Sequence, residues 1–552
     1  MKTSSRFCST RSTRSTLSTL ITLPLASLAF AGCSLAPTEP PALDAASEPV
    51  ADQTAVSISG PVVTSSQLKG LSIAFEASAE PSNELIARIR SGFSLPASDH
   101  AAVARELAWY AGHPDYITRV FGRGSRYLYH IAGVLEARGM PADLALLPIV
   151  ESAFDPFAYS RGRASGLWQI IPGTGDMLGL KQNWWYDGRR DIVDSTRAAL
   201  DYLEHLHQRF DGDWLLAVAA YNSGEGHVAR AINRAKSEGR ATDFWSLRDN
   251  LRSETAAYVP KLLAIRDLVA RPDAHGIDLP VIDNVPFFAV VETEGQIDIA
   301  LAAELGSLDI NALYELNPGV NRWATDPDGP HRLLVPVEQA TDIATALDSL
   351  EATERVRWTR HQISRGETLS EIAENYETTP AVLREVNALA GTVIRTGDHL
   401  MIPHASAAAG SYSLSLDART ARQQDRERDG NRVDYRVKAG DSLWEIANRF
   451  GVSTNELASW NAMAPRDVLS VGRNIVIWSD DPLAASLASI AGPSEIRRVD
   501  YVVRQGDSLA AIASRFRVTV DNLLDWNELS ADRYLQPGQA LVLYVDVTEQ
   551  ST

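Results

Sequence analysis

One glutamate of this sequence has the surroundings of a general acid. Glu151 ends the run Leu144-Ala-Leu-Leu-Pro-Ile-Val-Glu, and at helical spacing it shares one face with Leu144 and Leu147. A carboxylate on an apolar face is costly unless it is protonated or paired, and burial raises the pKa of a glutamate towards neutrality. Such a group can act as a general acid. The alternative is a glutamate at a helix end that points to solvent, with Pro148 interrupting the helix.

Further polar and aromatic blocks follow Glu151-Ser152 along the chain. They are Ser160, Gly166-Leu-Trp-Gln169, Ala220-Tyr-Asn222 and Tyr258 within Thr255-Ala-Ala-Tyr-Val. This series resembles the motifs of the soluble-type lytic transglycosylase domain, whose fold is related to goose-type lysozyme, and the resemblance covers about residues 81–275. Three blocks resemble more narrowly the membrane-bound lytic murein transglycosylase D family: Asn183-Trp-Trp-Tyr-Asp-Gly-Arg-Arg-Asp191, Thr242-Asp-Phe-Trp245 and Tyr258-Val-Pro-Lys261.

The resemblance implies a role for each matching residue. Glu151 matches the single catalytic acid and base of the family. The substrate-binding positions of the family are matched by Ser152, Ser160, Gln169, Tyr221, Asn222 and Tyr258. Ser152 is expected to fix the local backbone, and Tyr258 is expected to lie near the catalytic carboxylate. The chain departs from the family pattern at Trp168, where methionine is common, and at Arg252, where proline is expected.

The implied reaction needs only one carboxylate. An ordinary glycosidase uses two. In a lytic transglycosylase the 6-hydroxyl of the N-acetylmuramic acid itself attacks C1, so the β-1,4 bond to N-acetylglucosamine breaks and a 1,6-anhydromuramyl end forms. No metal and no cofactor are expected. Two alternatives stay open: a non-catalytic peptidoglycan-binding scaffold, and a hydrolytic muramidase whose second carboxylate would be Asp187, Asp191 or Asp194.

The C-terminal half repeats one unit three times. The copies open with Gly366-Glu-Thr-Leu, Gly440-Asp-Ser-Leu and Gly506-Asp-Ser-Leu, and an asparagine follows 21 residues after each glycine: Asn387, Asn461 and Asn527. Thr368, Ser442 and Ser508 are predicted helix N-caps, the first two with Glu three residues later as in a capping box. The pattern predicts strand, helix, helix, strand. It resembles the LysM module, which implies binding to glycans that contain N-acetylglucosamine.

A fourth, degenerate copy is predicted at residues 285–336. The apolar run Phe288–Val291 stands where the first strand would be, and Asn317 keeps the position of the repeat asparagine. The Gly-Asp-Ser turn is missing from this copy. We therefore expect it to have a packing role and not to bind glycan.

The element pattern predicts a multidomain chain. Apolar residues at three- and four-residue spacing predict a mainly α lysozyme-like catalytic domain, and small α+β (βααβ) LysM modules follow it. Stretches rich in Ala, Ser or charged residues are read as linkers, so the modules should move semi-independently. The predicted parts are 1–32 signal peptide, 33–80 flexible tether, 81–275 catalytic domain, 285–336 degenerate LysM-like segment, 357–404 first LysM module, 405–432 linker, 433–478 second module, 479–498 linker and 499–545 third module.

The N-terminal segment is typical of a bacterial lipoprotein signal. A basic start leads into an apolar stretch that ends Phe30-Ala-Gly-Cys33, and the only other cysteine is Cys8. The resemblance implies lipidation of Cys33 and cleavage before it, with Ser34 favouring delivery to the outer membrane. Plain secretion with a free cysteine is the alternative. The expected location is the periplasm, with a lipid anchor in the outer membrane, peptidoglycan strands as partner and a monomeric state.

Composition excludes other classes of function. The chain has 552 residues, of which 22% are charged, and a formal net charge of −18. Such an acidic balance argues against binding nucleic acid through its phosphates and against adhesion to anionic lipid through a basic patch. With two cysteines, both near the N-terminus, the mature chain has no disulfide framework.

Overall fold

The computed structural model describes residues 62–63, 84–480 and 496–546, apart from 377, 388, 390, 439, 471, 505–506, 517, 519, 528, 530–534 and 537. The predicted signal peptide, Cys33, nearly all of the tether 33–80 and most of the linker 479–498 lie outside the described residues.

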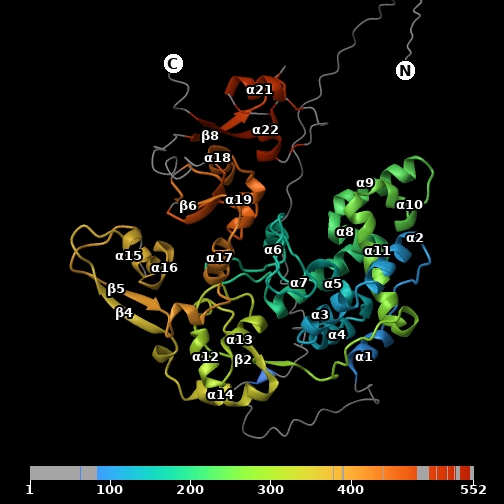
Figure 1. Cartoon of the computed structure of the whole chain (residues 1–552), viewed down its shortest axis with the longest axis horizontal. Helices are drawn as coiled ribbons and strands as arrows, with labels where there is room; N and C mark the ends of the chain where they lie inside the picture. The colour runs from blue at the N-terminus through green and yellow to red at the C-terminus, as the bar shows by residue number, and fades with distance from the viewer. Residues whose placement is uncertain are drawn as a thin grey trace, which may run out of the picture. The chain divides into compact units, whose positions relative to one another are not determined.

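Residues 84–275 form a helical domain, which confirms the mainly α prediction (Figure 1). Leu144, Leu147 and their apolar neighbours at helical spacing are buried in one continuous core. Aspartates cap three of the helices, because Asp191, Asp213 and Asp243 accept hydrogen bonds from main-chain N–H groups of the first turn. The elements are α1 (Leu85–Ser91), α2 (Ala101–Ala111), α3 (Pro114–Gly124), α4 (Leu128–Ala137), η2 (Ala142–Leu146), α5 (Leu147–Ser152), α6 (Pro172–Met177), α7 (Ile192–Arg209), α8 (Trp214–Ser223), α9 (Glu225–Ser237), α10 (Phe244–Leu247), η3 (Arg248–Asn250), α11 (Ser253–Ala270) and η4 (Pro272–His275).

The degenerate fourth copy has the predicted order of elements. It consists of β2 (Phe288–Glu292), α12 (Ile299–Leu305), α13 (Ile310–Leu316) and β3 (Arg332–Pro336), followed by η5 (Val337–Gln339), α14 (Ala340–Asp348) and η6 (Ala352–Glu354). β2 and β3 pair antiparallel, and the short β1 (Val62–Val63) pairs parallel with β2.

Strand β2 is buried on both faces. Phe288 and Val290 belong to the core of the helical domain, whereas Ala289 and Val291 belong to the core of the copy itself. Successive side chains of a strand point to opposite faces, so one strand serves two cores, and a strand buried on both faces is apolar throughout. The packing role that the sequence predicted for this copy is therefore supplied by its strands.

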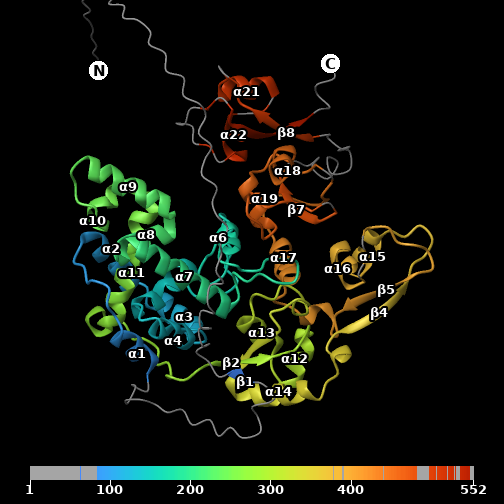
Figure 2. The same cartoon turned by 180° about the vertical axis from the view of Figure 1, so that it is seen from behind.

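The three repeats all adopt the predicted strand, helix, helix, strand order. Figure 2 shows α15 and α16 of the first copy beside the β4–β5 pair. The predicted caps form in each copy: Thr368 with Glu371, Ser442 with Glu445, and Ser508 with the main chain of Ala511. The elements are β4 (Arg357–Gln362), α15 (Leu369–Asn375), α16 (Pro380–Val386) and β5 (His399–His404); β6 (Asn431–Arg436), α18 (Leu443–Arg449), α19 (Thr454–Trp460) and β7 (Asn474–Ser479); β8 (Ile496–Val502), α21 (Leu509–Phe516), α22 (Val520–Trp526) and β9 (Ala540–Asp546).

The repeated asparagine is a structural residue. In the second module the Asn461 amide nitrogen donates to the carbonyls of Leu457 and Val476, both at 2.8 Å, and its oxygen accepts from the Val476 N–H at 2.7 Å. The side chain thus joins the end of the second helix to the last strand. The same three bonds are made by Asn317, Asn387 and Asn527.

The predicted linker 405–432 is folded for much of its length. It contains η7 (Ala409–Ser411) and α17 (Leu416–Gln424). Tyr412 donates to both carboxylate oxygens of Asp298 at 3.0 Å, and Arg322 of the fourth copy forms an ion pair with Asp417. Polar contacts and a few apolar residues, among them Tyr412 and Leu414, hold this segment without a continuous apolar stripe, which explains why its composition indicated a flexible linker.

Replacing Asn461 by alanine should loosen the second module. The substitution leaves buried main-chain groups of Leu457 and Val476 without partners, which costs about 1–3 kcal/mol. Hydrogen exchange of the full chain, followed by mass spectrometry, should show faster exchange in β6 and β7. The exposed Asn448→Ala in the same module is the control, and equal exchange in both variants would contradict the structural role.

Candidate active site

Glu151 lies on a short helix whose second residue is a proline. Pro148 occupies the first turn of α5, where its missing N–H is not needed, so it starts the helix and does not interrupt one as the sequence alternative held. Ala153 and Phe154 follow in the left-handed region, with φ of 51° and 55°, and end the helix directly after Glu151 and Ser152. The carboxylate is thereby fixed at the end of a helix whose apolar residues Leu147 and Ile149 are buried.

The Glu151 side chain is partly buried, and its carboxyl group is bonded to a tyrosine. The Tyr258 hydroxyl donates a short hydrogen bond to Glu151 Oε1. Burial raises the pKa of Glu151 to about 7, the bond from Tyr258 lowers it, and the nearby charge of Glu254 raises it. Burial and the Glu151 carboxylate also hold the pKa of Tyr258 well above its ordinary value, so the phenol keeps its proton. The carboxyl group can therefore both give and take a proton near neutral pH.

Two helices bring the tyrosines and the amide to Glu151. Tyr258 lies on α11, which packs against α5 and α8, and α8 carries Tyr221 and Asn222. The Tyr221 hydroxyl donates to the carbonyl of Trp168 at 2.8 Å. Thr255 Oγ1 donates to Asn222 Oδ1 at 2.8 Å, so the amide nitrogen of Asn222 is turned away from Thr255. Residues more than 100 positions apart in sequence thus meet at one carboxylate.

Ser152 ends α5, and the loop between α5 and α6 carries Ser160 and Gln169. Ser152 Oγ donates to the carbonyls of Leu167 at 2.9 Å and Pro148 at 3.2 Å, which ties the helix end to the loop. Ser160 Oγ accepts from the Ala164 N–H at 3.0 Å. The Gln169 amide donates to the carbonyl of Gly166 at 2.9 Å. In this structure the side chains of these three residues are thus bonded to the loop's own main chain.

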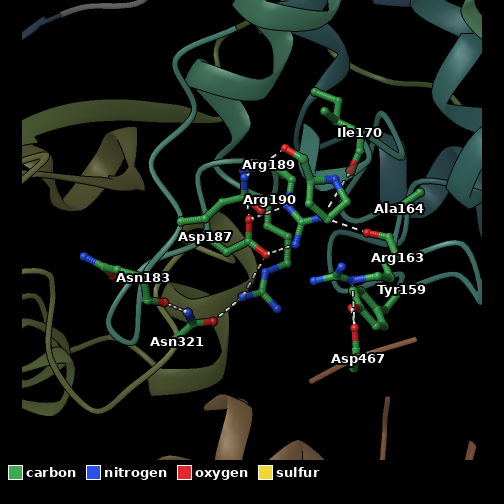
Figure 3. A network of polar contacts seen from close by, with 12 residues as sticks. Tyr159, Arg163, Ala164, Ile170, Asn183, Asp187, Arg189, Arg190, Asn321 and Asp467 are labelled. Carbon is green, nitrogen blue, oxygen red and sulfur yellow. Dashed lines mark hydrogen bonds and ion pairs between the residues drawn. The ribbon is translucent and has the colours of Figure 1, made fainter. Parts of the chain in front are cut away.

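The centre of this loop is packed tightly. Gly166 has φ of 79°, and a Cβ there would lie 2.4 Å from the carbonyl oxygen of Arg189. Arg189 is buried, pairs with Asp187 at 2.8 Å and donates to the carbonyls of Arg163 and Ile170 (Figure 3). Trp168, which departs from the family methionine, is fully buried and donates to Thr196.

The aspartates weighed as a second catalytic carboxylate are bound elsewhere. Asp187 pairs with Arg189, and Asp191 and Asp194 both pair with Arg332 on strand β3, at 2.8 and 3.3 Å. Asp155 Oδ1 accepts from the Phe157 N–H at 2.9 Å and so fixes the backbone. All four have structural partners, and none of them is a cause of the pKa shift of Glu151.

Glu254 and Thr255 belong to the site but were not predicted. Glu254 acts on Glu151 through its charge, and Thr255 orients Asn222. Both stand in the block around Tyr258, which is where a sequence signal could have been sought. No group of three or more His, Cys, Asp or Glu side chains that could hold a metal ion occurs among the residues that the structure describes.

Family models match the chain in the parts described above. A model described as "Transglycosylase SLT domain" matches residues 131–244, and one described as "LysM domain" matches 361–403, 435–478 and 501–543. Residues 287–352 match "Lytic transglycosylase MltD, LysM-like domain". The chain is 34% identical over 465 residues to the membrane-bound lytic murein transglycosylase D of Escherichia coli (strain K12), which covers 84% of this chain and 86% of that protein.

This chain belongs to the membrane-bound lytic murein transglycosylase D family. It is also 46% identical over 136 residues to a putative tributyltin chloride resistance protein of Alteromonas sp. (strain M-1), covering 24% of this chain and 66% of that protein. Among solved structures it is similar to the 70 kDa soluble lytic transglycosylase of Escherichia coli, with 29% identity and a TM-score of 0.21 over 26% of this chain and 23% of that one. As a member of this family the chain is a lytic transglycosylase with peptidoglycan-binding LysM repeats.

The hydrogen bond between Tyr258 and Glu151 should set the pH at which Glu151 ionises. The bond favours the carboxylate, so Tyr258→Phe should raise the pKa of Glu151 above about 7. Infrared difference spectra between each protein and its Glu151→Gln counterpart isolate the carboxyl band of Glu151 for titration. Tyr116→Phe on α3 is the control, and an equal or lower pKa in Tyr258→Phe would contradict the assignment.

Proposed function

We propose that this lytic transglycosylase cleaves the β-1,4 bond between N-acetylmuramic acid and N-acetylglucosamine and leaves a 1,6-anhydromuramyl end, with Glu151 as its single acid and base. Family membership supports the activity, and the LysM matches support attachment to peptidoglycan. The observation that carries the chemistry is the Glu151 carboxyl group, which is partly buried and bonded to Tyr258, with a pKa that burial raises to about 7.

In the first step Glu151 acts as an acid. Its protonated carboxyl group gives the proton to the bridging oxygen as the bond from that oxygen to C1 of the N-acetylmuramic acid breaks. The leaving N-acetylglucosamine end departs as an alcohol. The Tyr258 hydroxyl bond stabilises the carboxylate that this step leaves behind, so it offsets part of the cost of ionising a buried group.

In the second step the same group acts as a base. The carboxylate takes the proton of the 6-hydroxyl while that oxygen forms a bond to C1, which closes the anhydro ring and restores protonated Glu151. Both reacting groups belong to one sugar, so the proximity advantage is large and no water needs to be activated. One carboxyl group near its own pKa serves both steps.

The other site residues are proposed to hold the glycan. Asn222, oriented by Thr255, would offer its amide nitrogen to a sugar oxygen, and Tyr221 would shape the groove beside Trp168. Ser160 and Gln169 would exchange their loop hydrogen bonds for contacts to substrate. Ser152 would act only through the backbone that it fixes.

The cellular setting is also a proposal. The Phe30-Ala-Gly-Cys33 sequence supports lipidation of Cys33 and an outer-membrane anchor on the periplasmic side, with the chain acting as a monomer. Within the described ranges, no helix combines the length and the apolar composition that crossing a bilayer requires. The name of the Escherichia coli relative, a membrane-bound enzyme, agrees with attachment to a membrane.

Digestion of peptidoglycan sacculi tests the proposed reaction. The purified chain should release muropeptides with 1,6-anhydromuramyl ends, measured by mass, and Glu151→Gln should abolish release while sacculus binding persists. The exposed Glu204→Gln on α7 is the matched control and should keep full activity. Reducing muramic acid ends would instead indicate hydrolysis with a second carboxylate such as Glu254, and binding without release by the wild type would indicate a scaffold.

Removing the third module should weaken binding without affecting chemistry. Tandem modules bind a polymer by avidity, so deletion of residues 499–546 should lower sacculus affinity by about tenfold or more. Turnover of short soluble glycan strands should stay within about twofold of the full chain, because a short strand engages the catalytic groove alone. Pull-down with sacculi measures the first quantity, and unchanged affinity would refute glycan binding by this module.

A further inference from the structure

The loop after the catalytic glutamate is held from two sides. We call residues 155–165, which contain Ser160, the Ser160 segment. Arg189 of the catalytic domain holds its far end by donating to the carbonyl of Arg163 at 2.7 Å. The near end and the middle are contacted by parts of the chain that lie outside the catalytic domain.

An aspartate of the second LysM module contacts the middle of the segment. The Tyr159 hydroxyl lies 3.1 Å from both carboxylate oxygens of Asp467, and Arg163 Nε lies 2.8 Å from Asp467 Oδ1 (Figure 3). Ser160 stands between these two residues in sequence. Asp467 is itself fixed, because its Oδ2 accepts from the Ala464 N–H at 2.8 Å, and its side chain is only 15% exposed.

The linker helix α17 contacts the near end of the segment and also the second module. The Arg419 guanidinium lies 4.5 Å from the centre of the Phe157 ring, which also packs against the core of the fourth copy. At the other end of α17, Gln423 donates to the carbonyl of Ser459 and Gln424 donates to Asn461 Oδ1, both at 2.8 Å. The helix thus bonds to the second module at one end and to the Ser160 segment at the other.

The contact is specific to the second repeat. Asp467 lies six residues after the repeat asparagine Asn461 and five before Gly472. The other copies have a glycine at the matching place, Gly397 and Gly538. The corresponding residue of the third copy is Arg533, and the first copy, which is one residue shorter there, has Thr392 and Val393. Neither of the other copies can offer a carboxylate to Tyr159 and Arg163 from this position.

We propose that Asp467 is a positioning residue for cleavage, which holds the Ser160 segment through Tyr159 and Arg163 and so makes the second LysM module part of the catalytic machinery. This inference rests on the proposed function, because it requires the Ser160 segment to border the glycan. The Asp467 carboxylate accepts from the Tyr159 hydroxyl and the Ala464 N–H and forms an ion pair with Arg163, so it is better ordered than an isolated exposed pair. Loss of the Asp467 carboxylate should release the Ser160 segment. Small displacements of the groups that bind substrate slow a reaction strongly.

Hydrogen exchange tests the contact without using activity. In the full chain, Asp467→Ala should speed exchange across residues 155–165 while β6 and β7 keep their protection. Asp434→Ala is the control in the same module, since Asp434 is exposed and forms an ion pair with Arg432 on its own strand. Unchanged exchange of the segment in Asp467→Ala would overturn the proposal, whatever the enzyme does.

Kinetics on short soluble glycan strands test the consequence. Asp467→Ala and Tyr159→Phe/Arg163→Ala should lower kcat by about three- to tenfold, with sacculus binding unchanged, whereas Asp434→Ala should match the wild type. Arg163→Asp should lower kcat further, because this substitution places two carboxylates together. Adding Asp467→Arg to Arg163→Asp should recover most of the lost rate, which a role of Asp467 in the folding of its own module alone would not produce.

The two proposals fail in different ways. If the wild type releases no anhydro ends, the proposed reaction is wrong, and hydrogen exchange still decides whether Asp467 holds the segment. If the wild type is active but Asp467→Ala turns over at the wild-type rate, the reaction stands and the positioning role is wrong. Loss of rate without recovery in the charge exchange would also overturn it.

Discussion

The site depends on limiting the hydration of one carboxyl group. Burial raises the pKa of Glu151 to about 7, and this shift needs walls around the group, because full hydration would return the pKa to its ordinary range. The walls here are α5, α8 and α11, tied by Tyr258 to Glu151 and by Thr255 to Asn222. The raised pKa also has a cost, because the unfolded chain, in which the pKa of Glu151 is lower, releases its proton first. The folded chain therefore loses stability as the pH rises from the ordinary pKa of a glutamate to about 7, and the penalty stays constant above that. The surrounding core must supply stability to offset it.

That core extends beyond the helical domain. Strands β2 and β3 of the LysM-like copy contribute Phe288, Val290 and Leu334 to the same apolar cluster as the helices, and Arg332 pairs with Asp191 at the start of α7. A module of the LysM type thereby contributes to the hydrophobic core of the catalytic domain. The two cores share strands and not merely a surface, so the catalytic domain and this copy should unfold together.

The sequence predicted what depends on local spacing. The apolar face of Glu151, the repeat and its caps could be read from residues close together, whereas the series that ends at Tyr258 followed from the family resemblance. The structure has these caps and the contact between Glu151 and Tyr258. The alternative that Pro148 interrupts the helix was wrong, because Pro148 lies in the first turn of α5, directly after η2. The sequence reading failed where tertiary contacts decide. The segment around α17 looked flexible because Tyr412, Asp417 and Arg419 hold it through partners far away in sequence.

The asparagine shared by all four copies has a consequence for how such modules are recognised. Its amide joins a helix end to a strand that lies 14 to 17 residues further on. A copy can then lack the Gly-Asp-Ser turn, as the one with Asn317 does, and keep its architecture. Searches keyed to the turn will undercount the copies in a protein, whereas an asparagine followed at this interval by an apolar strand will also find copies that contribute to the core of a neighbouring domain.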